Sequence, residues 1–260
     1  NYRKSMAETQ QGMRKAQGSG TLPGIDLFPR VKYNGRTIDA AVFGSRVYNK
    51  NIAAMRERYS HSKDLPNVTF RPLTTAESLA VAGYGFRSLA KPQIFDPIWL
   101  QAGLVLRATE GVWINPLRDD NGYVLMDEQA LEQRLDGIRP VYGIYLLDGD
   151  TSFVPHASFE RRVQEHGKFL EGGLARGLVH TADKKATTLS SIANRDVYPD
   201  GVDVWAFEPV INPILRVVEL GSGWYFDGNW FVVGGCGYGG GLDGFAFGGL
   251  VSGEASAPRN

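Results

Sequence analysis

Three carboxylates border the most strand-like segment of the chain and are its strongest candidates for chemistry. Asp200 precedes the alternating run 202–207, Asp203 lies within it, and Glu208 follows it. Carboxylates at the start of a strand and along it can hold Mg²⁺, and the bound metal can activate a water molecule. Asp200, Asp203 and Glu208 are therefore a candidate catalytic set for a metal-dependent enzyme that acts on nucleic acid.

The order Pro199-Asp200, Asp203 and Glu208 resembles the core of the PD-(D/E)xK nucleases. The resemblance implies Mg²⁺ as the cofactor, held by these acids, and a nucleic acid as the substrate. The sequence departs from the family pattern in two ways: the spacing from Asp200 to Glu208 is tight, and Pro209 and Val210 follow Glu208 where a lysine is expected. The nuclease is accordingly the alternative to a non-enzymatic structural protein, which would need no cofactor.

The glycine-rich segment 235–240 offers two other enzymatic interpretations. Its glycine pattern matches a dinucleotide-binding turn, but no helix is predicted after it to point an N-terminus at a pyrophosphate. Cys236 within it could be a nucleophile with glycine amides as an oxyanion hole. The four histidines all lie far upstream of Cys236, so a small buried apolar side chain is the simpler interpretation.

Two further groups of polar residues are predicted to be structural. The segment 148–152 begins like a calcium loop but has Phe153 and Phe159 where a glycine and a bidentate glutamate are needed, so it is predicted to be a turn. His156, His166 and His180 fall on or near one predicted helix, with the last two about 21 Å apart along it. That separation is too large for a shared metal.

Composition limits the possible partners of the chain. Lysine plus arginine equals aspartate plus glutamate at 28 each, and 43% of the 260 residues are hydrophobic. A neutral balance gives no long-range field that attracts nucleic acid or an anionic membrane, and no membrane partner is predicted. A local basic patch in residues 1–17 could still bind nucleic acid. One cysteine excludes an internal disulfide framework, which favours a reducing compartment or a virion over a disulfide-rich secreted protein.

The element pattern predicts an α+β fold: a mostly antiparallel sheet of several hairpins packed against one long and several short helices. A buried central strand is predicted at 141–147 and a short strand at 68–71. Trp113 is expected to be exposed on the second of the three hairpins. Turn sequences between strand-like runs indicate three hairpins: Asn34-Gly35 between 25–33 and 36–43, Glu110-Gly111 between 100–109 and 112–117, and Asp227-Gly228-Asn229 between 224–226 and 230–233.

The longest predicted helix runs from Ser158 to Thr181. Phe159, Val163, Leu170, Leu174 and Leu178 mark its inward face, and Gly173 and Gly177 would let another element approach its backbone closely. Shorter helices are predicted at 51–59, 74–83, 127–135 and 183–193. Thr74 and Glu77 form a capping box at the second of these, and Asp127 caps the third.

Three regions are predicted along the chain: an N-terminal arm with a flexible linker (1–24), a single α+β domain (25–251) and a polar C-terminal tail (252–260). Because no set of residues fixes a chemistry, the first hypothesis is a non-enzymatic structural protein, a subunit of a large homo-oligomer such as a virion component. A glycine-rich and aromatic C-terminal region could pack between subunits. The alternative is the nuclease, using Asp200, Asp203 and Glu208.

Overall fold

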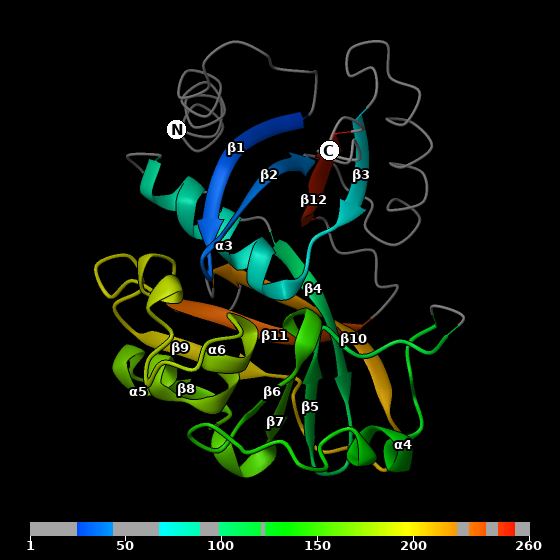
Figure 1. Ribbon diagram of the computed structural model, residues 1–260. Coiled ribbons are helices and arrows are strands. Elements are labelled where there is room, and N and C mark those ends of the chain that lie inside the picture. Colours follow the sequence, from blue (N-terminus) through cyan, green and yellow to red (C-terminus); the bar gives the residue numbers. More distant parts are fainter. Residues whose placement is uncertain are drawn as a thin grey trace.

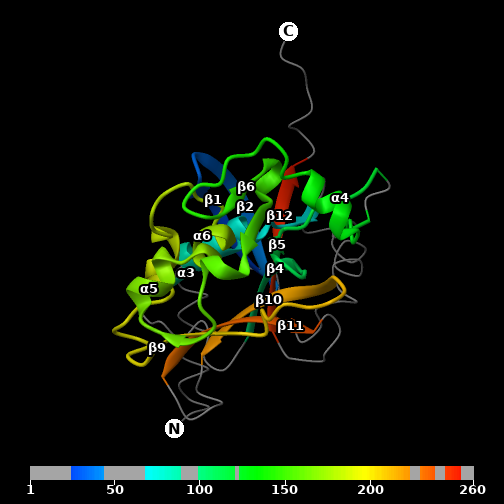
Figure 2. The same ribbon diagram turned by 90° about the horizontal axis from the view of Figure 1, so that it is seen from below.

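The computed structural model describes residues 25–43, 68–88, 99–120, 123–222, 229–237 and 244–252. Within them the strands form one curled, mostly antiparallel sheet, and the helices are few and short (Figure 1, and Figure 2 from below). The predicted α+β class is confirmed. The predicted arm, nearly all of the predicted tail and the predicted helix at 51–59 lie outside the described residues.

The sheet runs in the order β1-β2-β12-β4-β10-β11-β9-β8. The pairs β12–β4 and β11–β9 are parallel, and all others along this path are antiparallel. The strands on the path are β1 (Ile25–Tyr33), β2 (Arg36–Phe43), β12 (Gly244–Ser252), β4 (Trp99–Arg107), β10 (Ile214–Ser222), β11 (Trp230–Gly237), β9 (Gly201–Trp205) and β8 (Arg162–Gln164).

Four strands branch from this path. One edge of β4 is shared, because its first residues pair with β12 and its last three pair with β5. Between the two partners lies Gly103, with φ 149°, and a side chain at that position would collide with Thr75. Glycine is therefore required where the sheet divides. The branches are β3 (Val68–Pro72) on β12, β5 (Gly111–Ile114) on β4 and β7, and β6 (Tyr145–Leu146) on β7 (Ser152–Pro155).

The first two predicted hairpins are confirmed as β1–β2 and β4–β5. For the third, β10 pairs with β11 across residues 223–229, and the predicted strand 224–226 lies outside the described residues. The predicted exposure of Trp113 is wrong, since only 1% of its surface is exposed. The ring of Phe153, on β7, lies 4.8 Å from the ring of Trp113. The added strand β7 thus covers a side chain that an isolated hairpin would expose.

Helix α3 (Thr75–Ser88) crosses the middle of the molecule (Figure 1). It extends beyond the end predicted at residue 83, and every residue from 75 to 83 is buried. Alanines at three of these positions, 76, 80 and 82, let neighbouring elements approach the helix closely. Helix α3 therefore lies inside the core, and its first residue, Thr75, is buried there as well.

The predicted long helix from Ser158 to Thr181 is wrong. In its place are a 3-10 turn η3 (His156–Ser158), strand β8 and two short helices, α5 (His166–Glu171) and α6 (Gly173–Leu178). Gly172 separates the helices with extended backbone angles, φ −69° and ψ 154°. Val163 is 51% exposed on β8 rather than facing inward. The apolar residues keep a helical spacing through segments that are extended in the structure, so the sequence pattern resembled that of one helix.

The close approach predicted for the helix glycines is confirmed. A side chain at Gly177 would collide with Val154 on β7 and Ile114 on β5, and one at Gly173 would collide with Ser158. The glycine α-carbons let α6 lie directly against these neighbours. Leu170, Leu174 and Leu178 are buried as predicted.

Among the other predictions, the strand at 68–71 is confirmed as β3. The helix cap at Asp127 is confirmed too: α4 (Glu128–Gln133) begins after it, and its carboxylate accepts from the backbone N of Ala130 at 3.1 Å. The helix at 183–193 is only a 3-10 turn, η4 (Thr187–Ser191). The central strand at 141–147 is also wrong: only β6 forms, at the end of a branch. Positive φ at Tyr142 and Gly143, 48° and 82°, makes a turn there.

Among the described residues, no helix has both the length and the apolar character needed to cross a lipid bilayer.

We expect Gly177→Ala to lower the free energy of unfolding by about 1–3 kcal/mol, because the added methyl group overpacks the contact with Val154 and Ile114. Urea denaturation followed by circular dichroism measures this. Gly167→Ala on α5 is the matched control, since its side chain would enter open space; a helix glycine replaced without strain adds stability of about 0.4–1 kcal/mol. Equal effects of the two substitutions would contradict the packing argument.

Candidate functional site

Two of the three acids predicted as a catalytic set have structural partners of their own. Asp200 is exposed, and its Oδ2 accepts from the backbone N of Asn229 at 2.8 Å, at the start of β11. Glu208 is exposed and pairs with Arg107 at 3.2 Å. Asp203 is half-buried on β9, and burial raises the pKa of its carboxyl.

In the part of the chain that the structure describes, which includes all three of these acids, no group of three or more histidine, cysteine, aspartate or glutamate side chains is arranged to hold a metal ion.

Two other candidate segments from the sequence, the glycine-rich segment and 148–152, are located as follows. Residues 235–237, which include Cys236, continue strand β11, and the rest of the glycine-rich segment, 238–240, lies outside the described residues. Segment 148–152 forms the 3-10 turn η2 (Asp148–Asp150) and the start of β7.

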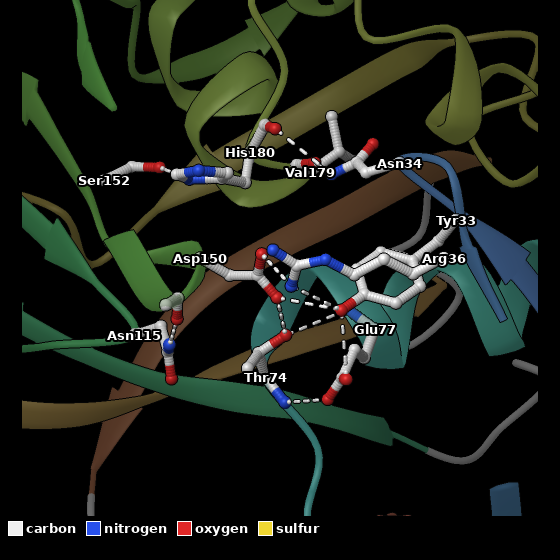
Figure 3. A network of polar contacts seen from close by, with 11 residues as sticks. Tyr33, Asn34, Arg36, Thr74, Glu77, Asn115, Asp150, Ser152, Val179 and His180 are labelled. Atoms are coloured by element: carbon white, nitrogen blue, oxygen red, sulfur yellow. Dashed lines mark hydrogen bonds and ion pairs between the residues drawn. The ribbon is translucent and has the colours of Figure 1, made fainter. Parts of the chain in front are cut away.

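A network of polar side chains, three of them buried, lies elsewhere in the described part of the chain, where the β1–β2 hairpin meets α3 and η2 (Figure 3). We call Tyr33, Arg36, Thr74, Glu77 and Asp150 the Tyr33 cluster. Tyr33 and Arg36 flank the tight turn Asn34-Gly35, whose positive φ angles of 41° and 73° are those a hairpin turn needs. The other three residues come from the N-terminus of α3 and from η2.

The capping box at the start of α3 fixes Glu77. The backbone N of Thr74 donates to Glu77 Oε2 at 2.9 Å, and the backbone N of Glu77 donates to Thr74 Oγ1 at 3.2 Å, as the sequence predicted. The remaining oxygen, Oε1, faces the hydroxyl of Tyr33 at 3.1 Å. Glu77 is only 3% exposed, so a residue predicted to cap a helix also supplies a buried carboxyl to the cluster.

Asp150 completes the cluster from η2. Thr74 Oγ1 donates to its Oδ2 at 2.9 Å, Tyr33 Oη lies 3.2 Å from the same oxygen, and Arg36 Nη1 lies 3.4 Å from Oδ1. The carboxylate stands between the guanidinium of Arg36 and the hydroxyl of Thr74 (Figure 3). Gly149 and Asp150 both have positive φ, 68° and 62°, and this turn directs the carboxylate inward.

A second group of polar contacts borders the cluster on the side of α6. Asn34 Nδ2 donates to the carbonyls of Val179 and His180, each at 3.2 Å, and ties the hairpin turn to the end of α6. Ser152 Oγ donates to the Gly177 carbonyl at 3.1 Å and lies 3.0 Å from His180 Nδ1. These bonds hold the hairpin, α6 and β7 together.

Ser152 and His180 do not form a nucleophile and base in this arrangement. Ser152 is 0% exposed, and its single proton is directed to the Gly177 carbonyl. His180 Nδ1 must therefore donate to Ser152 Oγ, because the hydroxyl has no second proton to give. Burial lowers the pKa of His180, although Asp150 acts in the opposite direction. The imidazole is neutral at pH 7 and serves as a donor.

Burial dominates the electrostatics of Tyr33. It raises the pKa of the phenol to about 12, the hydrogen bond from Arg36 opposes the shift, and the charges of Glu77 and Asp150 add to it. The Arg36 side chain is 61% exposed and brings the cluster to the surface. Chemically the cluster contains two buried carboxyl groups and a buried phenol, and the phenol contacts both carboxyl groups and the guanidinium of Arg36. The arrangement joins three elements, and the guanidinium is its exposed part.

Sequence reasoning missed Tyr33, Arg36 and Asp150 as functional candidates. The turn Asn34-Gly35, the capping box and the turn at 148–152 are each recognisable in the sequence, and each places one part of the cluster. Nothing local indicates that they meet, because Tyr33 and Asp150 are 117 residues apart.

Comparison with known proteins gives no match: no family model fits the sequence, no curated protein is significantly similar to it, and no solved structure matches the fold. The function must be argued from the described residues themselves.

We expect the stability advantage of the wild-type protein over Tyr33→Phe to shrink as pH rises from about 10 to about 12. The unfolded phenol ionises near 10 and the folded one at about 12, so alkali favours the unfolded state in between. The loss should be about 1–3 kcal/mol. Urea denaturation of both proteins across this range measures it, and a difference that is independent of pH would contradict the burial of this hydroxyl.

Proposed function

We propose that this chain is a non-enzymatic structural protein that assembles with copies of itself. The observation that carries the proposal is an apolar loop, residues 206–213, that is held firmly and yet exposes its central side chain. Ile211 is 92% exposed, the most of any large hydrophobic residue in the described part of the chain. A single exposed apolar residue is common, so the argument depends on how the loop is held.

Hydrogen bonds from the end of β4 and from the turn that follows it fix the loop. Arg107 donates to the carbonyl of Glu208 at 3.1 and 2.7 Å through Nε and Nη2, and Thr109 Oγ1 donates to the carbonyl of Val210 at 3.0 Å. Pro209 and Pro213 limit the backbone further. A loop ordered before binding loses little conformational entropy when a partner covers it, so Ile211 is well suited to serve as an anchor.

Other exposed apolar side chains lie at the same end of the molecule and enlarge its apolar surface. The backbone N of Thr109 also donates to Glu128 Oε1, on α4, at 2.7 Å. Tyr123 and Met126, 73% and 40% exposed, precede that helix directly. Figure 1 places α4 beside the start of β10, which follows the loop. A stable contact needs about 800 Å² from each partner, more than Ile211 alone can give.

Mixed charges around the loop favour a second copy of the chain as the partner. Glu208 is 57% exposed beside Arg107, so this end carries both signs close together. A two-fold contact sets each charge of one copy against the opposite charge of the other. The carboxylates Asp200, Asp203 and Glu208 have separate partners or surroundings, so they add no second candidate function.

We expect Ile211→Asp to lower the solution mass of the full chain, because association would then have to bury a carboxylate in place of the apolar anchor. Removing the burial of one isoleucine side chain, about 1.5–3 kcal/mol, weakens association by roughly 10- to 100-fold. Light scattering at two protein and two salt concentrations measures the mass of each variant.

Val163→Asp on β8 is the matched control, since Val163 is exposed at another part of the surface, and Asp203→Ala on the neighbouring strand β9 is a second control. Both should keep the wild-type mass. A wild-type protein that is monomeric at every concentration would contradict the proposed assembly. If the wild-type mass is large and Ile211→Asp does not change it, the contact between copies lies elsewhere than at this loop.

A further inference from the structure

The turn Asn34-Gly35 combines a reactive sequence with an exposed position. An asparagine side chain can react with the backbone N of the next residue, and glycine hinders this approach least because it has no side chain. Both residues are exposed, so water has access to the turn. Their positive φ angles, 41° and 73°, form the tight turn between β1 and β2. The chain can therefore modify itself here without an enzyme or a cofactor.

The reaction consumes only water. The backbone N of Gly35 attacks Cγ of Asn34, so a bond between N and Cγ forms, the bond between Cγ and Nδ2 breaks, and ammonia leaves with the proton of the Gly35 N. Water then opens the cyclic imide at either of its carbonyl groups. Opening at Cγ gives aspartate at this position, and opening at the backbone carbonyl gives isoaspartate, in which the chain runs through Cγ. Nothing is oxidised or reduced, and the loss of ammonia makes the change permanent.

The contact with the end of α6 opposes this reaction. Asn34 Nδ2 donates to the carbonyls of Val179 and His180, each at 3.2 Å (Figure 3). Both acceptors are carbonyl oxygens, which cannot donate, so the nitrogen of the side-chain amide must face α6. The attack requires Cγ to turn toward the Gly35 N and the amide nitrogen to leave both carbonyls. The hairpin turn must therefore separate from α6 before Asn34 can react.

The products cannot restore this contact. A carboxylate has no hydrogen to donate, and its oxygen would face two carbonyl oxygens at the place where the amide nitrogen now lies. Isoaspartate also lengthens the backbone within a tight turn, whose length sets the register of the flanking strands. Either product removes both hydrogen bonds that join the hairpin turn to α6.

We infer that Asn34 is a self-modification site and that the contact of the hairpin turn with α6 controls its rate. Separation of the turn from α6 permits the loss of ammonia, and the product then keeps the two apart. A reversible local opening thus becomes a permanent release of the hairpin turn. This inference does not rest on the assembly proposed above.

Asn115 provides a control within the same chain. It also has a positive φ, 50°, and its Nδ2 donates to the carbonyl of Gly149 at 2.7 Å. The next residue is Pro116, and the backbone N of a proline has no hydrogen to release. Imide formation by this route is therefore blocked at Asn115, although its backbone angle and its hydrogen bond resemble those of Asn34.

Peptide mapping by mass spectrometry measures the reaction. The full chain is incubated at one pH and temperature, folded in one sample and unfolded in guanidinium chloride in the other. Asn34 should convert in both samples, and roughly 10- to 100-fold more slowly in the folded protein, the factor that two ordinary hydrogen bonds contribute to the docked state. Asn115 should stay intact in both.

Three outcomes of this comparison would contradict the inference. No conversion of Asn34 in the unfolded chain would overturn the modification site. Equal rates at Asn34 in the two samples would overturn the control by α6. Conversion confined to the unfolded chain would overturn a release that takes place in the folded protein.

The effect of the product is measured with Asn34→Asp, since aspartate tolerates a positive φ as asparagine does. Hydrogen exchange followed by mass spectrometry should show amides of β1, β2 and α6 exchanging roughly 10- to 100-fold faster than in the wild-type protein. Asn34→Gly is the matched control, because it loses both hydrogen bonds without introducing a charge, and its exchange should lie between the other two. Exchange in Asn34→Asp as slow as in the wild-type protein would show that the product stays docked, which would overturn the release.

Discussion

The arrangement of the molecule depends on the close approach of α3 to β4 at Gly103. With no side chain at this position, the backbone of β4 lies directly under Thr75, the first residue of the helix. The same strand is where the sheet divides between β12 and β5. The contact therefore sets the N-terminus of α3 at the junction of both branches, and Thr74 and Glu77 are positioned with it.

The other half of the Tyr33 cluster is positioned by turns. In the β1–β2 hairpin, Asn34 and Gly35 hold Tyr33 and Arg36 as a facing pair, and Asn34 also bonds the end of α6. On the other side, Gly149 and Asp150 turn the chain before β7. The cluster thus joins one hairpin, one helix N-terminus and one turn.

Local patterns in the sequence predicted the hairpin, the helix N-terminus and the turn correctly. They could not predict that these three elements lie in contact. Asn34-Gly35 indicated a hairpin because positive φ is required there, and Thr74 with Glu77 indicated a helix start because both backbone donors need partners. The contact of Tyr33 with Asp150 depends on packing across 117 residues. The long helix from Ser158 failed for a related reason: apolar spacing does not reveal that Gly172 is extended, and tertiary contacts decided its conformation.

Burying Tyr33, Glu77 and Asp150 together is costly, since polar groups of this kind are often replaced by apolar residues of similar volume without loss of stability. The benefit we infer is registration of the hairpin. Strand β1 is at the edge of the sheet and carries Pro29 and a register shift between Phe28 and Val31, so its backbone pairing is interrupted halfway. A slip of one residue beyond that point would replace Tyr33 by Lys32 or Asn34 and reverse the faces of the strand. Neither Lys32 nor Asn34 has an aromatic ring to fill the place that Tyr33 takes in the core, so the cluster selects one register where the backbone pairing is weakest.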